Sequence, residues 1–179
     1  MARFSYGAKV NCRTSVLPDL EAVPFIIMEI KNHPVPFSVL LADDDIDDCA
    51  FFKEALKEFP LTTSFTAVHD GEELMNLLNA TVSALPHVIF LDLNMPRKNG
   101  FECLSAIKQH KQLNHLPVIM YSTSLEQDTV NLLFKNGAHH FIRKPAEFSK
   151  FTGIIQQALT LIADDNTKQP RIENFILTV

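Results

Sequence analysis

PHVIFLDLNMPRKNG, residues 86–100, carries the clearest structural signal in the chain. The apolar run at residues 88–91 is only four residues long and shows no alternation with polar residues. This pattern is typical of a central parallel strand that is covered on both faces. The run ends at Asp92, and the residues that follow are rich in turn formers, so the backbone is expected to leave the sheet there. Asp92 is therefore predicted at the carboxyl end of a buried strand, where open α/β sheets place their chemistry.

On both sides of this stretch, short apolar or β-branched runs alternate with segments whose apolar residues have helical spacing. Strands are predicted at residues 37–42, 62–68, 88–91, 118–121 and 139–143, and a helix is predicted after each one. Five strand–helix pairs with short links predict an α/β fold, a doubly wound parallel sheet of five strands with helices on both faces.

The predicted domain covers residues 37–162. Residues 1–36 contain four prolines and no sustained period, so they are expected to form a weakly structured extension, and Met28 is a candidate for the true start of translation. Residues 163–179 are expected to form a tail, whose apolar end at residues 175–177 is a candidate for docking on the domain.

Composition and charge argue against several classes of function. The net charge is −5 and the pI is about 5.8, which argues against binding to nucleic acid or to an anionic membrane. No apolar run has the length of a membrane span, and the first residues lack a signal-peptide pattern. Cys12, Cys49 and Cys103 are too widely spaced to suggest a disulfide framework or a zinc site. These features favour a protein of the reducing cytoplasm.

Polar side chains follow four of the five predicted strands. They are the acidic run 43–45, then Asp92, Ser122 and Lys144. Because the carboxyl ends of parallel strands meet at one edge of a sheet, these groups are expected to converge. Neighbouring carboxylates repel each other unless a cation lies between them, and Mg²⁺ prefers oxygen ligands. An ionised aspartate beside Mg²⁺, with an ammonium and a hydroxyl nearby, is a competent nucleophile toward a phosphoryl group.

Each of these residues also has a purely structural interpretation. Asp45, Asp47 and Asp48 are expected to cap the following helix or to complement its dipole. Asp92 alone would be read as a turn residue, Ser122 as a helix cap and Lys144 as a surface lysine. Their occurrence together, each directly after a predicted strand, favours the functional interpretation for Asp43, Asp44, Asp92, Ser122 and Lys144.

With these residues in this order, residues 37–162 resemble a receiver domain of the response regulators of two-component signalling, similar to the chemotaxis receiver. The resemblance implies a flavodoxin-like sheet of order 2-1-3-4-5. It also implies that Asp44 and Asp92 bind Mg²⁺ through their carboxylates, that Asp43 does so directly or through water, and that Asn94 contributes its backbone carbonyl.

The resemblance further implies that Asp92 is the phosphoacceptor and that Ser122 moves toward the aspartyl phosphate. Phe141 would turn inward in response, without the hydroxyl of the more common tyrosine. A cis Lys144–Pro145 bond is also implied, as a device that aims the lysine.

The function implied is that of a single-domain response regulator and not of an enzyme with a separate substrate. A sensor histidine kinase or a histidine phosphotransfer protein would phosphorylate Asp92, and the domain would assist its own phosphorylation and dephosphorylation. The signal would pass to an unknown protein partner through the face made by the fourth helix, the fifth strand and the fifth helix.

Two alternatives remain open at this point. A haloacid-dehalogenase-type phosphatase also uses aspartate, Mg²⁺, a hydroxyl and lysine. Its D-x-D motif follows its first strand, which Asp43 and Asp45 imitate, but its late acid pair follows a strand, whereas Asp164 and Asp165 follow a predicted helix. The second alternative is a receiver that binds partners without being phosphorylated.

Overall fold

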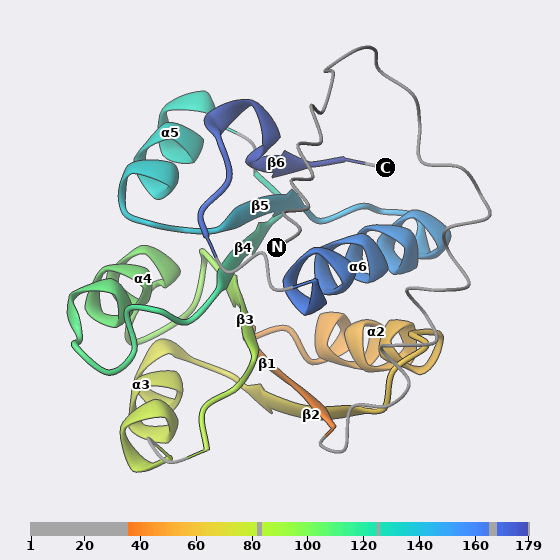
Figure 1. Cartoon of the computed structure of the whole chain (residues 1–179), viewed down its shortest axis with the longest axis horizontal. Helices are drawn as coiled ribbons and strands as arrows, with labels where there is room; N and C mark the ends of the chain where they lie inside the picture. The colour runs from red at the N-terminus through yellow and green to blue at the C-terminus, as the bar shows by residue number, and fades with distance from the viewer. Residues whose placement is uncertain (1–35, 82–83, 125, 165–167, 179) are drawn as a thin grey trace, which may run out of the picture.

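A parallel sheet of six strands forms the centre of the domain and is covered by helices on both faces (Figure 1). The computed structural model describes residues 36–81, 84–124, 126–164 and 168–178. Within these residues the strands are β1 (Phe37–Ala42), β2 (Thr63–Val68), β3 (Val88–Asp92), β4 (Val118–Ser122), β5 (His140–Arg143) and β6 (Ile176–Leu177). The helices are α2 (Ile46–Lys57), α3 (Gly71–Ala80), α4 (Gly100–Gln109), α5 (Gln127–Lys135), α6 (Phe148–Ala163) and the short 3-10 helix η1 (Ile172–Asn174).

Two hydrophobic cores lie against the sheet, one on each face. Helices α3, α4 and α5 cover one face, and α2 and α6 cover the other, as Figure 1 shows. Successive residues of a strand point to opposite faces, so Ile89 and Leu91 enter the first core while Val88 and Phe90 enter the second. All five residues of β3 are buried, which confirms the prediction of a central strand.

Helix caps stabilise the starts of α2 and α4, the helices that follow β1 and β3. The Asp45 side chain caps α2 by accepting bonds from the backbone N–H groups of Asp47 and Asp48. Asn99 and Glu102 form a capping box at the start of α4. These caps allow each helix to begin a few residues after its strand, so the strand ends and helix starts share one edge of the sheet.

Helix α5 ends in a left-handed cap at Gly137. Gly137 has φ +87°. Its N–H donates to the Phe134 carbonyl at 3.0 Å, and the N–H of Ala138 donates to the Leu133 carbonyl at 3.2 Å. This pair of bonds is a Schellman motif, and it turns the chain directly into β5.

The strand order is β2-β1-β3-β4-β5-β6, so the predicted order of the first five strands is confirmed. The predicted number of strands is wrong by one, because the C-terminal residues add β6 in parallel to β5. Phe175, directly before β6, is fully buried, and its ring lies edge-on to Phe134 with the centroids 5.2 Å apart. Burial of this aromatic explains why the chain end docks at the sheet edge.

The predicted extension at residues 1–36 and the possible start at Met28 lie, except for Pro36, outside the described residues. In the part of the chain that the structure describes, no helix has the length and apolar character needed to cross a membrane.

Candidate functional site

Three carboxylates meet at the carboxyl edge of the sheet. Asp43 and Asp44 follow β1, and Asp92 is the last residue of β3. The two strands are neighbours, with Ala42 in register with Leu91, and this pairing brings the acids together. One ligand oxygen from each of the three residues lies within 4.8 Å of the other two. Asp43 and Asp92 are buried and Asp44 is exposed, so the group opens to solvent on one side.

Burial disfavours the ionised form of the two inner acids. It raises the pKa of Asp43 from 3.8 to about 6, although the Lys144 ammonium, which donates a hydrogen bond to it, opposes this rise. Burial also raises the pKa of Asp92, against the opposing charge of Lys144 and a backbone hydrogen bond from Asn94. A divalent cation would favour the ionised form of all three acids, and an all-oxygen donor set suits Mg²⁺ or Mn²⁺. The acid group therefore fits a divalent metal.

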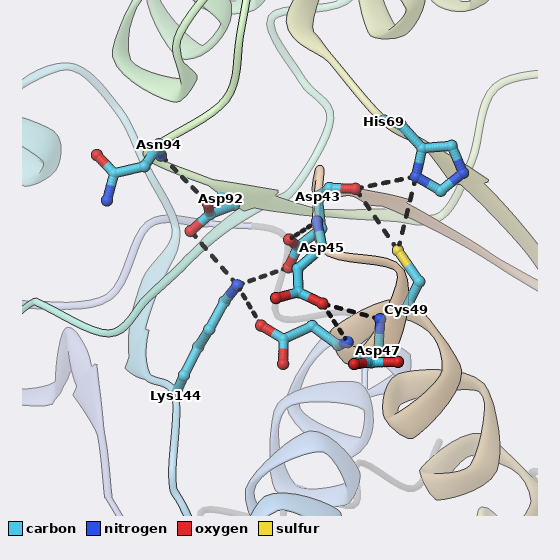
Figure 2. Close-up of polar contacts among 9 residues, drawn as sticks. Asp43, Asp45, Asp47, Cys49, His69, Asp92, Asn94 and Lys144 are labelled. Atoms are coloured by element: carbon cyan, nitrogen blue, oxygen red, sulfur yellow. Dashed lines mark hydrogen bonds and ion pairs between the residues drawn. The ribbon is translucent and has the colours of Figure 1, made fainter.

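Lys144 follows β5 and extends its ammonium toward these acids (Figure 2). The Nζ atom lies 2.6 Å from Oδ2 of Asp43, 2.8 Å from Oδ2 of Asp48 and 3.6 Å from Oδ1 of Asp92. It also lies 4.7 Å from the ring centroid of Tyr121, which is a cation–π distance. Burial alone would lower the pKa of this lysine, but the neighbouring carboxylates raise it above its ordinary value. Lys144 is therefore a charged group at the site.

The expected cis bond before Pro145 is wrong, because no peptide bond in the described residues is cis. The trans form is the intrinsic preference of such bonds. The backbone N–H of Lys144 donates to the Ser122 carbonyl at 2.8 Å, and the carboxylates hold the ammonium. These contacts aim the lysine without a cis bond.

Ser122 is the last residue of β4, directly after Tyr121, which is in register with Asp92. Its hydroxyl is fully buried and has no hydrogen-bond partner within the described part of the chain. Buried hydroxyls usually have partners, so the Ser122 hydroxyl is an unused donor at the carboxyl edge of the sheet. Phe141, on the neighbouring strand β5, is fully buried in the core.

The turn after Asp92 is held by the acid itself. The backbone N–H of Asn94 donates to Oδ2 of Asp92 at 3.1 Å, while the Asn94 side chain points away from the acids (Figure 2). Asp92 is therefore both a turn residue and a member of the acid group, so the two interpretations of this residue do not exclude each other.

Asp48 is the residue that sequence reasoning missed. The expectation for Asp45 as a cap is confirmed, and Asp47 is exposed, but Asp48 does more than complement the helix dipole, because it forms an ion pair with Lys144. The helical spacing of the sequence did indicate which way the Asp48 side chain faces. Asp48 lies four residues before the buried Phe52, so it continues the core-facing stripe of α2 toward the sheet edge.

A cavity of about 320 Å³ adjoins Lys144. It lies between the first turns of α2 and α6, and both polar and aromatic side chains line it. The lining residues are Asp48, Phe51, Tyr121, Thr123, Lys144, Pro145, Ala146, Phe148 and Phe151.

Comparisons with known proteins agree with this geometry. A family model described as "Response regulator receiver domain" matches residues 39–156. Response regulator Rcp1 from Synechocystis sp. is 29% identical over 133 residues, which cover 72% of this chain and 90% of Rcp1. The probable methanogenesis regulatory protein FilR2 from Methanothrix harundinacea is 26% identical over 125 residues, which cover 68% of this chain and 81% of FilR2.

Solved structures show the same fold. The phosphorylated cyanobacterial phytochrome response regulator RcpA superposes with a TM-score of 0.68 at 28% identity, over 73% of this chain and 96% of RcpA. The Mn²⁺-bound form of Rcp1 superposes with a TM-score of 0.63 at 28% identity, over 68% of this chain and 91% of Rcp1.

Proposed function

Because this chain belongs to the response regulator receiver family, we propose that Asp92 accepts a phosphoryl group from a phosphohistidine on a sensor kinase or phosphotransfer protein. The observation that carries this proposal is the position of Asp92 within the three-acid group, 3.6 Å from the Lys144 ammonium. Membership of this family argues against the phosphatase alternative, whose motif order the chain does not follow. The domain is thus a component of two-component signalling, and its phosphorylation is the signal.

Each residue has a role that follows from its chemistry. A carboxylate oxygen of Asp92 would attack the phosphorus atom, and the bond from phosphorus to the donor's histidine nitrogen would break as the aspartyl phosphate forms. Lys144 would neutralise charge on the phosphoryl oxygens, and the buried Ser122 hydroxyl would donate a hydrogen bond to one of them. Asp43, Asp44, Asp92 and the backbone carbonyl of Asn94 would hold Mg²⁺, which supplies further positive charge to those oxygens. With these groups the domain would assist its own phosphorylation and dephosphorylation.

The surface beside the site offers a place for the phosphodonor. Ile46, Phe51 and Phe148 are large apolar residues that are 74%, 53% and 41% exposed. Phe51 and Phe148 line the cavity next to Lys144. A partner that presents a phosphohistidine to Asp92 must cover this region, and apolar side chains would give it contact area. We propose this surface as the docking area for the donor.

Phosphorylation can be tested with a small phosphodonor. After incubation with Mg²⁺ and acetyl phosphate or phosphoramidate, intact-mass measurement is expected to show one added phosphoryl group that is stable in acid and labile in base. Asp92→Asn should show no adduct, whereas Asp128→Asn, an exposed acid in the first turn of α5, should behave as the wild type. The absence of an adduct on the wild type would contradict the proposal and favour a receiver that is not phosphorylated. An equal adduct on Asp92→Asn would also contradict it, because the phosphoryl group would then be on another residue.

A further inference from the structure

Among the described residues, the Lys144 ammonium has three carboxylate neighbours, and one of them lies outside the acid group. Asp43 and Asp92 belong to the group of oxygens that fits a divalent cation, while Asp48 does not. We propose that Asp48 is a positioning residue for phosphoryl transfer, which acts by holding the Lys144 ammonium beside Asp92. This proposal rests on the proposed function of Asp92.

A cation bound by the acid group would change the partners of Lys144. Asp43 and Asp92 would then share their negative charge with the metal, and the metal and the ammonium would repel each other. Within the part of the chain that the structure describes, Asp48 is the carboxylate that contacts Lys144 and lies outside the metal-binding group. Its charge would therefore keep the ammonium at the site when the other two acids are occupied.

Asp48 is well placed for this role because α2 fixes its backbone. It lies in the first turn of the helix, and its N–H donates to Oδ1 of Asp45 at 3.2 Å. Its side chain is 32% exposed and that of Lys144 is 9% exposed, so the pair is shielded on the side of the lysine. Such a pair is stronger than one between two fully exposed side chains.

Tyr121, in the core beneath α2 and α6, also contacts the lysine. Its ring lies 4.7 Å from Nζ and belongs to an aromatic cluster with Phe52 and Phe151, whose ring centroids lie 6.1 and 5.9 Å from that of Tyr121. The ring restricts the lysine side chain, and Asp48 restricts its charged end. An ammonium held in this way needs little reorganisation when a phosphoryl group arrives, which lowers the barrier to transfer.

The proposal predicts a specific pattern of rates. Asp48→Asn should lower the rate of phosphorylation by a small donor at saturating Mg²⁺ by about three- to tenfold. Asp48→Glu, which keeps the carboxylate, should recover part of the rate. Asp47→Asn is the matched control, because it removes the same charge from the same helical turn at an exposed position that has no contact with Lys144. Its rate should equal that of the wild type.

A double-mutant cycle shows whether Asp48 acts through the lysine. In the Lys144→Gln background, Asp48→Asn should produce no further loss. An equal loss in both backgrounds, an equal loss in Asp47→Asn, or no loss in Asp48→Asn would overturn the proposal.

A second measurement is independent of phosphorylation. The ¹³Cε resonance of Lys144, assigned by its absence in Lys144→Gln, should shift in Asp48→Asn and stay unchanged in Asp47→Asn, with Mg²⁺ present. An unchanged resonance in Asp48→Asn would overturn the proposal even where rates differ. If the wild type accepts no phosphoryl group, the proposed function of Asp92 fails, while the resonance still reports whether Asp48 holds Lys144.

Discussion

Asp43, Asp92 and Ser122 each carry a cost of burial in the folded domain. Burial raises the pKa of both Asp43 and Asp92, so their ionised forms are disfavoured in the folded state. The hydroxyl of Ser122 is buried without a hydrogen-bond partner in the described residues. Groups of this kind cluster at sites where a ligand or a modification completes their interactions. The stability and the metal affinity of the domain can therefore test the roles of these residues without knowledge of any partner protein.

Replacing Ser122 with alanine should stabilise the unphosphorylated domain. Removing a buried hydroxyl that lacks a partner relieves its desolvation penalty, so the free energy of unfolding should rise by about 1 kcal/mol. Chemical denaturation measures this change. The gain in stability on phosphorylation should be smaller in Ser122→Ala than in the wild type, because the hydroxyl can no longer donate to the phosphoryl group. Ser124→Ala, at an exposed position, is the control and should change neither quantity.

The affinity for Mg²⁺ should weaken in mild acid. A proton competes with the cation for Asp43, whose pKa is about 6. Between about pH 7 and about pH 5 the apparent dissociation constant should therefore rise about tenfold, which calorimetric titration can measure. Without bound cation, the same shift makes the free energy of unfolding fall as the pH rises through about 6, because the folded state holds the proton more tightly. Equal affinity at both pH values would show that Asp43 does not take part in metal binding.

Among the elements, the β3–α4 connection depends on Gly100. A Cβ atom on Gly100 would lie 2.0 Å from the carbonyl oxygen of Asp92, and backbone atoms cannot give way as a flexible side chain can. The N–H of Gly100 also donates to the Leu93 carbonyl at 3.0 Å, which closes the loop. The glycine thus allows α4 to start directly against the end of β3.

Gly100→Ala should therefore disturb both the fold and the site. We expect the free energy of unfolding to fall by about 2 kcal/mol, because the loop must move away from Asp92 to admit the methyl group. Phosphorylation of Asp92 should slow in the same variant. Gly153→Ala, inside α6, is the control. Alanine is favoured over glycine by about 1 kcal/mol inside a helix, so the free energy of unfolding should not fall in this variant. Denaturation that finds Gly100→Ala as stable as the wild type would contradict this account of the loop.

The end of strand β3 was predicted correctly because the sequence pattern that marks it lies within a few residues. The abrupt end of the apolar run predicted where β3 stops. Asp48 was missed because its role depends on Lys144, which lies 96 residues further along the chain. A helix face can be inferred from spacing, but the charged group that will oppose it is set by the tertiary arrangement.

For the domain as a whole, periodicity predicted the layered α/β architecture, and the strand order came from the resemblance to receiver domains. The sixth strand could not be predicted in either way. It is two residues long, and so short an apolar segment carries no period that distinguishes a strand from a packed tail. Its pairing with β5 is decided by the burial of Phe175 and by the open edge that β5 would otherwise present.

The C-terminal segment should consequently stabilise the edge of the sheet that carries Phe141. The backbone N–H of Phe141 donates to the Phe175 carbonyl at 2.9 Å, and the Gln169 side chain donates to the carbonyls of Phe134 and Ala138. Phe175→Ala leaves a large cavity against Phe134, so the free energy of unfolding should fall by about 3 kcal/mol. Ile172→Ala is the control, because Ile172 is 42% exposed and should lose less than about 1 kcal/mol.

Hydrogen exchange separates docking of this segment from global stability. If the segment detaches in Phe175→Ala, the amide of Phe141 should exchange much faster, whereas amides of the central strand β3 should change only as much as the global free energy of unfolding requires. Equal acceleration at both strands would mean that the segment unfolds only with the rest of the domain. Selective acceleration at Phe141 would mean that the C-terminal segment can open by itself, and that the edge of β5 is then free to pair with another chain.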